Sequence, residues 1–217
     1  MRRWILAGHL AVAPIADAVA QSAQPVEARR WSIGLTLGDI RYHGGTRDAP
    51  LDEGVIRFTP YRPTPIGIRA ELGGSGLRIG IGIEYAEPGL AGSGASEPGG
   101  PAAGTIVLER LLTTYTVTPT ISIGLARLKG GGQLRSGLGI LLERWELPGE
   151  PGRNRVGVVG SLAVELGLFG SWVGSLTASY GVTPASPLTP DDLPEPYEPA
   201  ALWRRGLTGA VAYRFGR

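Results

Sequence analysis

Hydrophobic and polar positions alternate with a period of two residues along most of the chain after residue 25. In the stretch GLRIGIGIEYAEPG, residues 76–89, every second position from Leu77 to Tyr85 is large and apolar. The positions between them are charged or carry almost no side chain. Because successive side chains of a strand point to opposite faces, this period predicts a β-strand with one apolar face.

The same alternation recurs in eight segments, separated by punctuation that is rich in glycine or proline. The predicted strands are approximately residues 30–42, 64–73, 76–87, 104–123, 132–147, 154–168, 171–183 and 202–215. The pattern is blurred in 104–123, where Glu109 and Arg110 are adjacent, and we expect a β-bulge there.

The connections between these segments alternate in length. Residues 73–75, 127–131 and 169–170 are short connections and 148–153 is a medium turn, whereas 43–63, 88–103 and 184–201 are long. Outer-membrane barrels have an even number of strands, with short turns at one end and longer loops at the other. The sequence therefore predicts an all-β fold: an eight-stranded antiparallel up-and-down transmembrane β-barrel, with both termini at the end of the short turns.

The composition of the polar face indicates which face meets water. Soluble surfaces are typically about 25–35% charged, but this face is mostly Gly, Ala and Ser with an occasional Arg or Glu. Glycine weakens a strand unless close packing needs it, and an eight-stranded barrel is just wide enough for side chains to fill it. We therefore expect the apolar face to meet lipid and the small and charged residues to fill the lumen.

The charged residues expected in the lumen are four arginines and four glutamates. They are Arg69, Glu71, Arg78, Glu84, Arg135, Glu143, Glu165 and Arg214. Because an unpaired charge in a low-dielectric interior is costly, we expect these residues to pair across the lumen. The alternative is that they are solvated charges on the surface of a soluble protein.

Composition excludes several classes of site. The 217 residues suit one domain, and the absence of cysteine excludes disulfides and thiolate metal sites. The formal charge of +2 comes from 21 basic and 19 acidic residues that are scattered along the chain. A nucleic-acid interface would need basic residues clustered on one face, so no nucleic-acid partner is expected.

The N-terminus reads as a targeting segment. Arg2 and Arg3 precede an apolar stretch, and Ala18-Val19-Ala20 offers a cleavage site. This pattern predicts a signal peptide at 1–20, a short periplasmic segment at 21–27 and the transmembrane barrel domain at 28–217. The alternative is a buried N-terminal helix.

Aromatic residues gather near the predicted strand ends, where membrane barrels carry aromatic girdles. They are Trp31, Tyr42, Tyr85, Tyr115, Trp145, Trp172, Tyr180, Trp203, Tyr213 and Phe215.

The C-terminal stretch GLTGAVAYRFGR ends in a Tyr-x-Phe pattern formed by Tyr213 and Phe215. It resembles the C-terminal signal that the bacterial outer-membrane insertion machinery reads, although Gly216 and Arg217 follow Phe215. Together with the signal peptide and eight strands, this resembles the small outer-membrane barrels of the OmpA/OmpX kind. The resemblance implies a location in the bacterial outer membrane. It also implies outer-membrane lipid as a partner, and the barrel insertion machinery and periplasmic chaperones during biogenesis.

The sequence offers little catalytic chemistry. Some small outer-membrane barrels act on lipid A through a histidine near a serine, but His43, the one histidine after residue 20, has no neighbouring serine in RYHGGTRDAP. A general base needs a substrate or nucleophile within hydrogen-bond reach, so we interpret His43 as a loop residue and expect no catalytic, cofactor-binding or metal site.

The glycine runs precede no helix and are interpreted as turns. The proline-rich segment 184–201 predicts a solvated loop, with an exposed docking arm or a weak cation site as alternatives.

Three functions remain open from the sequence. The first is a non-enzymatic outer-membrane β-barrel with a lumen filled by an Arg/Glu network and a structural or surface-interaction role. The second is a narrow channel or conduit for small or hydrophobic solutes. The third is a secreted soluble β-protein.

Overall fold

The computed structural model describes residues 30–46, 49–51, 54–95, 105–109, 111–189 and 198–216, which form twelve β-strands. The strands are β1 (Arg30–Thr46), β2 (Ala49–Leu51), β3 (Gly54–Tyr61), β4 (Ile66–Gly73), β5 (Leu77–Ala86), β6 (Gly89–Ala95), β7 (Thr105–Leu108), β8 (Thr113–Arg127), β9 (Gln133–Glu146), β10 (Arg153–Gly167), β11 (Trp172–Thr183) and β12 (Pro199–Phe215). No helix in these ranges is long and apolar enough to cross a membrane.

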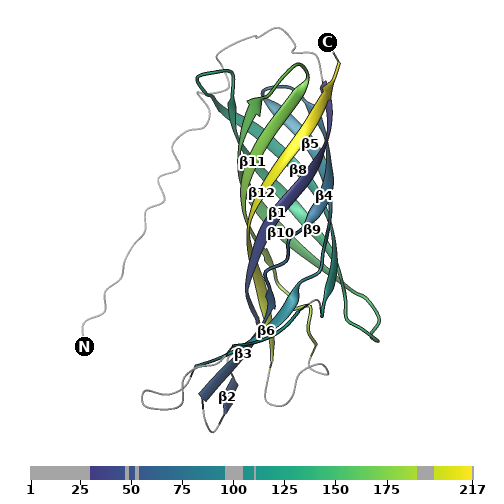
Figure 1. The fold of residues 1–217 in the computed structure, drawn as a ribbon, viewed down its shortest axis with the longest axis vertical. Helices are drawn as coiled ribbons and strands as arrows, with labels where there is room; N and C mark the ends of the chain where they lie inside the picture. The colour runs from purple at the N-terminus through teal and green to yellow at the C-terminus, as the bar shows by residue number, and fades with distance from the viewer. Residues whose placement is uncertain are drawn as a thin grey trace, which may run out of the picture.

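Eight of the strands form one closed antiparallel barrel. The order around the barrel is β1-β12-β11-β10-β9-β8-β5-β4, and β4 pairs with β1 to close it (Figure 1). The register places Trp31 opposite Phe215 on one side of β1 and opposite Leu72 on the other. Closure leaves the barrel without an unpaired edge, which a membrane-spanning sheet requires. The predicted fold is confirmed.

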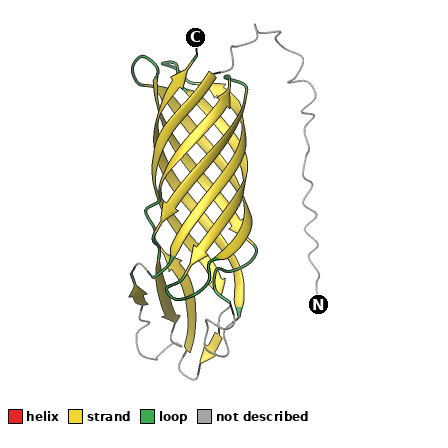
Figure 2. Ribbon diagram, turned by 90° about the vertical axis from the view of Figure 1, so that its right-hand side faces the viewer, coloured by secondary structure: helices red, strands yellow, loops and turns green. Residues whose placement is uncertain are grey.

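The connections are sorted by end, as the sequence predicted. Three short turns, between β4 and β5, β8 and β9, and β10 and β11, lie at the end that also holds the C-terminus (Figure 2). In the turn between β8 and β9, Gly130 and Gly131 have φ angles of 88° and 84°, which L side chains rarely adopt. We call these two ends of the barrel the turn end and the loop end.

The loop end carries a second sheet that the sequence did not predict. Its order is β2-β3-β6-β7. Strands β2, β3 and β6 come from connections that were interpreted as long loops, and β7 comes from the predicted strand 104–123. The predicted strand 104–123 is wrong as a single element, because β7 belongs to this second sheet and β8 to the barrel. The chain turns at Glu109 instead of forming a bulge there, and the register irregularity of β8 lies between Gly124 and Ala126.

The first barrel strand is longer than predicted and ends at Thr46, so His43 lies in a strand and not in a loop. On one side this extension still pairs with β12, for example His43 with Trp203. On its other side the chain after β3 follows it, with the amide of Ile40 donating to the carbonyl of Pro63 at 3.2 Å. The second sheet therefore continues directly from the wall of the barrel.

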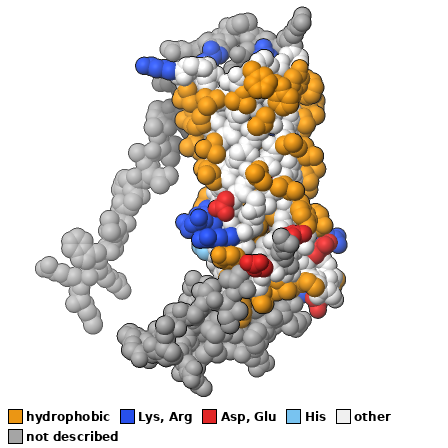
Figure 3. Space-filling model, in the orientation of Figure 1, with side chains coloured by type: hydrophobic (Ala, Val, Ile, Leu, Met, Phe, Trp, Pro, Cys, Tyr) orange, Lys and Arg blue, Asp and Glu red, His pale blue; other side chains and the backbone are white. Residues whose placement is uncertain are grey.

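The outside of the barrel is apolar (Figure 3). Leu35 and Leu138 are 70% and 69% exposed, and Ile79, Ile81 and Ile83 all point outward from β5. A soluble protein would bury such residues, whereas a bilayer takes up an outward-facing apolar band. The expected lipid-facing orientation is confirmed, and a secreted soluble protein is inconsistent with it.

Aromatic side chains border the apolar band at both ends. At the turn end, Tyr213 packs edge-on against Trp172 with ring centroids 5.4 Å apart, and at the loop end Trp203 packs against Tyr180 at 5.7 Å. Tyr213 and Trp203 are ten residues apart on β12, which is about 33 Å along a strand. A strand tilt of about 40° reduces this to about 25 Å along the barrel axis, the usual height of the lipid-facing band.

Two of the predicted girdle residues lie elsewhere. Tyr42 and Trp145 point into the barrel, and their rings pack edge-on with centroids 5.7 Å apart. Their positions in the alternation of β1 and β9 place them on the same face as the lumen residues.

Candidate functional site in the barrel lumen

Small inward residues let the eight strands close tightly around the lumen. A Cβ at Gly67 would lie 2.3 Å from the carbonyl oxygen of Ile83, and one at Gly157 would lie 2.5 Å from the carbonyl oxygen of Val182. Neither approach is compatible with a side chain unless the backbone moves. The glycines of the polar face therefore leave space in the lumen for a few long charged side chains.

A network of ion pairs crosses the lumen toward the turn end. Arg78 is 7% exposed and bonds Glu165 at 2.5 Å and Glu71 at 2.9 Å. Glu71 also pairs with Arg69 at 2.6 Å, and Glu165 pairs with Arg214 at 2.9 Å. The five residues come from β4, β5, β10 and β12, so the network ties strands on different sides of the barrel together. We call these residues the turn-end network.

Arg135 lies beside this network but is held differently. It is 2% exposed, and its guanidinium donates to the backbone carbonyls of Ser75 and Gly76, each at 2.9 Å, and of Ser122 at 3.2 Å. None of the ion pairs found among the described residues involves it. The prediction that Arg135 takes part in cross-lumen carboxylate pairing is therefore wrong. Its guanidinium instead donates to peptide oxygens of the turn between β4 and β5 and of β8.

A second charged group crosses the lumen toward the loop end. Arg204, 6% exposed, lies 3.4 Å from Glu84 and 3.5 Å from Glu143. Glu143 also accepts hydrogen bonds from Oγ1 of Thr183 at 2.9 Å and from Nε1 of Trp145 at 3.3 Å. We call Arg204, Glu84 and Glu143 the loop-end network.

Sequence reasoning missed Arg204, which is the cation of this network. The signal was present, because Leu207, Val211, Tyr213 and Phe215 place odd-numbered residues of β12 on the outside and even-numbered residues inside. Two adjacent arginines interrupt the alternation at this point, which made the inward residue hard to recognise. Arg204 faces the lumen and Arg205 faces outward.

An apolar plug closes the lumen beyond the loop-end network. Leu112, Trp145 and Leu202 are 0%, 0% and 1% exposed, and Tyr42, Leu90 and Leu147 pack against them. Leu112 precedes β8 and is held by a hydrogen bond of 3.0 Å from its amide to the carbonyl of Pro88. The plug therefore combines barrel residues with the segments that lead to the second sheet.

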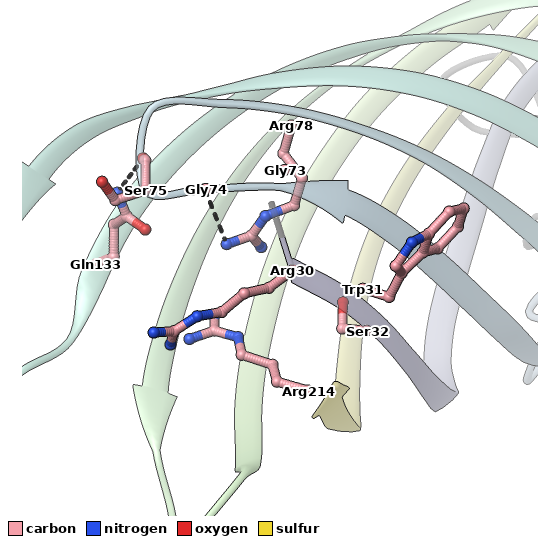
Figure 4. A pocket seen from close by; sticks show the side chains of 9 residues that line it. All are labelled: Arg30, Trp31, Ser32, Gly73, Gly74, Ser75, Arg78, Gln133 and Arg214. Atoms are coloured by element: carbon pink, nitrogen blue, oxygen red, sulfur yellow. Dashed lines mark hydrogen bonds between the residues drawn. The ribbon is translucent and has the colours of Figure 1, made fainter. Parts of the chain in front are cut away.

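Several small cavities remain in and beside the lumen, and neighbouring ones share lining residues. A cavity of about 90 Å³ between the two networks is lined mostly by Ser, Thr and small residues, with Arg69, Glu84 and Arg204 at its borders. A cavity of about 120 Å³ lies at the turn-end mouth, where Arg30, Arg78 and Arg214 point into the same space (Figure 4). A neighbouring opening of about 360 Å³ adjoins Gln133 and Arg127.

Comparison with solved structures identifies the fold. The chain is similar to neisserial surface protein A (NspA) with a TM-score of 0.53 and 8% identity, covering 86% of this chain and 97% of that one. It is also similar to the outer membrane protein OprG of Pseudomonas aeruginosa with a TM-score of 0.50 and 13% identity, covering 87% of this chain and 96% of that one. The chain has the fold of small outer-membrane β-barrels.

Sequence comparisons add nothing to this result. No protein-family model and no curated protein matches the chain. At such low identities the likeness concerns the barrel fold alone, so the chemistry of this barrel has to be read from its own residues.

The other residues singled out from the sequence lie outside the lumen or at its ends. The ring of His43 stacks on the ring of Trp203 on the outer surface, with centroids 6.2 Å apart. Tyr213 and Phe215 also face outward, at the turn end, with ring centroids 4.8 Å apart. No group of three or more histidine, cysteine, aspartate or glutamate residues that could hold a metal occurs in the described part of the chain.

The proline-rich segment is only partly solvated. Leu188 is 2% exposed, and the carbonyls of Ser186 and Pro187 accept hydrogen bonds from Arg155 at 2.6 Å and Arg153 at 3.2 Å. The interpretation of 184–201 as a solvated loop is wrong for residues 186–189, which pack against the barrel, whereas residues 184 and 185 are exposed. It is also wrong from Pro199 onward, where β12 begins. Residues 190–197 lie outside the described ranges.

Proposed function

We propose that this chain is a closed, non-catalytic β-barrel of the bacterial outer membrane that anchors its loop-end sheet at the cell surface. Its role on this proposal is structural or one of surface interaction. The observation that carries the proposal is the state of the lumen, which two ion-pair networks and an apolar plug fill in series.

The filled lumen argues against a channel. Any solute would have to separate Arg78 from Glu71 and Glu165, then Arg204 from its two glutamates, and then displace the apolar plug. Breaking a buried ion pair by removing one partner costs about 3–5 kcal/mol. Two such networks in series make spontaneous opening for conduction unfavourable.

The location and topology rest on the apolar band and the sorting of the connections. In outer-membrane barrels the short turns face the periplasm and the longer loops face outward. On the proposed orientation the second sheet lies outside the cell, and the exposed pair Tyr213 and Phe215 is proposed to act as the insertion signal. The expected signal peptide at 1–20 fits this route, as do the insertion machinery and periplasmic chaperones as biogenesis partners.

A non-catalytic role fits the surroundings of the single histidine after residue 20. On the outer surface the ring of His43 stacks on Trp203 and lies beside Tyr180. Acid–base catalysis would need a group within hydrogen-bond reach of a reacting atom. A ring stacked between aromatic residues at the edge of the band serves packing instead.

Conductance in planar bilayers tests the closed lumen. The wild-type protein is expected to give no ion-sized steps. A triple variant with Arg78→Ala, Arg204→Ala and Trp145→Ala, which removes the cation of each network and the largest side chain of the apolar plug, is expected to give steps. Trp172→Ala, an outward-facing change at the turn end, is the silent control. Steps from the wild type that Glu84→Gln abolishes would overturn the proposal in favour of a narrow channel.

Surface labelling tests the topology. Because the chain has no cysteine, single cysteines can be placed without a background. We expect a large membrane-impermeant maleimide to label Glu150→Cys, at the loop end, on intact cells. Lys129→Cys, in a short turn, should react only after the outer membrane is opened. The reverse result would contradict the proposed orientation.

A further inference from the structure

A group of polar side chains interrupts the apolar outer surface at the loop end, where β1, β12 and β11 lie side by side. Arg41 on β1 and Arg205 on β12 both point outward and are exposed. Figure 3 shows basic side chains next to a histidine at the edge of the apolar band. This group is separate from the lumen networks, since it lies on the opposite face of the same strands.

The two arginines lie directly opposite each other in the β-ladder. The register pairs Arg41 with Arg205, and Arg205 in turn with Tyr180 on β11. Side chains at such positions have Cβ atoms about 5 Å apart, and like charges directly opposite each other are destabilising. The barrel therefore holds two guanidinium groups close together at a cost that a shared anion would remove.

Among the described residues, a carboxylate neutralises only one arginine of this pair. Asp39 lies 3.4 Å from Arg41, with both side chains more than half exposed. Within the described part of the chain no ion pair involves Arg205. Two arginines and one aspartate leave a net positive charge on this patch.

Arg144 provides an internal comparison. It also points outward, near the loop end of β9, and is paired in the ladder with Tyr115, as Arg205 is with Tyr180. Arg144, however, has its own carboxylate, Glu146, at 2.8 Å. Two arginines in equivalent surroundings thus differ in whether the protein supplies their anion.

The surroundings of the patch indicate which kind of anion it can bind. Trp203 stacks on His43 and packs against Tyr180, with ring centroids 6.2 and 5.7 Å apart. Aromatic rings of this kind lie at the level of the lipid headgroups. Arginine binds phosphate through two parallel N–H donors, so two adjacent arginines can donate hydrogen bonds to one phosphate from two sides.

We propose that Arg41 and Arg205 bind the phosphate group of an anionic lipid in the leaflet at the loop end. The aromatic rings of Trp203 and Tyr180 lie beside the lipid where its headgroup meets its chains. On the proposed orientation this leaflet is the outer one, which contains a phosphorylated glycolipid. The binding chemistry itself does not depend on it.

Native mass spectrometry of the full chain tests this site. The protein is released from detergent micelles doped with lipid A, and the fraction that retains the lipid is measured. The wild type is expected to retain lipid A, and Arg41→Gln combined with Arg205→Gln should weaken retention at least about tenfold, as expected for the loss of charge-assisted hydrogen bonds. Arg144→Gln, which removes one charge from a neutral pair, is expected to leave retention unchanged.

Heat-modifiable gel mobility shows whether each variant is folded before it is compared. Equal retention by the wild type and the double variant would overturn the proposal, and so would an equal loss in Arg144→Gln, which would indicate a general charge effect. Titration with inorganic phosphate, followed by ³¹P NMR, distinguishes the sources. Binding of free phosphate at Arg41 and Arg205 by a protein that does not retain lipid A would show a soluble anion site instead of a lipid site.

This assay is independent of the tests of the proposed function. It uses purified protein in micelles, so a failure here leaves the conductance and labelling results standing. Conversely, a conducting or inverted barrel would leave the phosphate chemistry of Arg41 and Arg205 intact.

Discussion

Buried arginines in this lumen fall into two kinds that differ in what a substitution leaves behind. Arg135 donates mainly to peptide carbonyls, which remain hydrogen-bond acceptors without charge when it is removed. Arg204 faces two carboxylates, which would be left as uncompensated buried charges. The second kind of loss is the more costly one.

Arg204→Met is therefore expected to lower the free energy of unfolding by about 3–5 kcal/mol. Because methionine keeps much of the side-chain volume, little of the lost stability comes from a cavity. Most of it comes from the two carboxylates that are left buried without a cation. Urea unfolding in lipid vesicles, followed by tryptophan fluorescence, measures it. Adding Glu84→Gln and Glu143→Gln to the variant should restore most of the stability.

The control for this change is Arg144→Met on the outer surface, where an exposed ion pair contributes at most about 1 kcal/mol. A loss at Arg204 no larger than the loss at Arg144 would mean that water reaches the loop-end network. The lumen would then be more open than its ion pairs and apolar plug indicate.

At the scale of single elements, the two-residue period located all eight barrel strands, although it predicted β8 merged with β7 as one strand. Strands such as β5 and β10 have long uninterrupted alternation, and their predicted bounds agree with the structure to within one residue. The period also assigned the inward and outward faces, because neighbouring strands of a closed barrel must share one apolar face.

The second sheet could not be predicted by the same means. Its strand β6 has the sequence GLAGSGA, in which small residues carry no alternation. The segment 104–123 alternates on either side of the blurred stretch at Glu109 and Arg110, but a period reports which face is apolar and not which strand is the partner. The division into β7 and β8 depends on pairing with β6 and β5, which is decided by contacts far apart in the sequence.

The lipid-facing assignment of a strand can be tested by the depth dependence of a charge. Ile81 is in the middle of β5 and Leu77 is at its turn end, and both point outward. Ile81→Arg is expected to cost about 2–4 kcal/mol of unfolding free energy, against about 0–1 kcal/mol for Leu77→Arg near the interface. Urea titration in phosphatidylcholine vesicles measures both, and equal costs would contradict a membrane-spanning β5.

For the whole molecule, closure of the barrel is expected to be independent of most of the second sheet. All eight barrel strands pair with one another around the full circle without using β6 or β7. The chain entering β6 and the chain leaving β7 are already joined where the amide of Leu112 donates to the carbonyl of Pro88. A short glycine–serine linker in place of residues 89–111 can therefore connect β5 to β8 without altering the barrel ladder.

We expect this shortened protein to keep the compact, heat-modifiable gel mobility of a closed barrel, although it loses Leu90 from the edge of the apolar plug. The matched control is the single change Val159→Pro. Val159 pairs with both β9 and β11, so proline there removes a ladder hydrogen bond inside the barrel wall. One residue in the wall should then abolish the compact form while removal of a whole loop-end segment does not. If the shortened protein lost the compact form while Val159→Pro kept it, the barrel would need the second sheet in order to close.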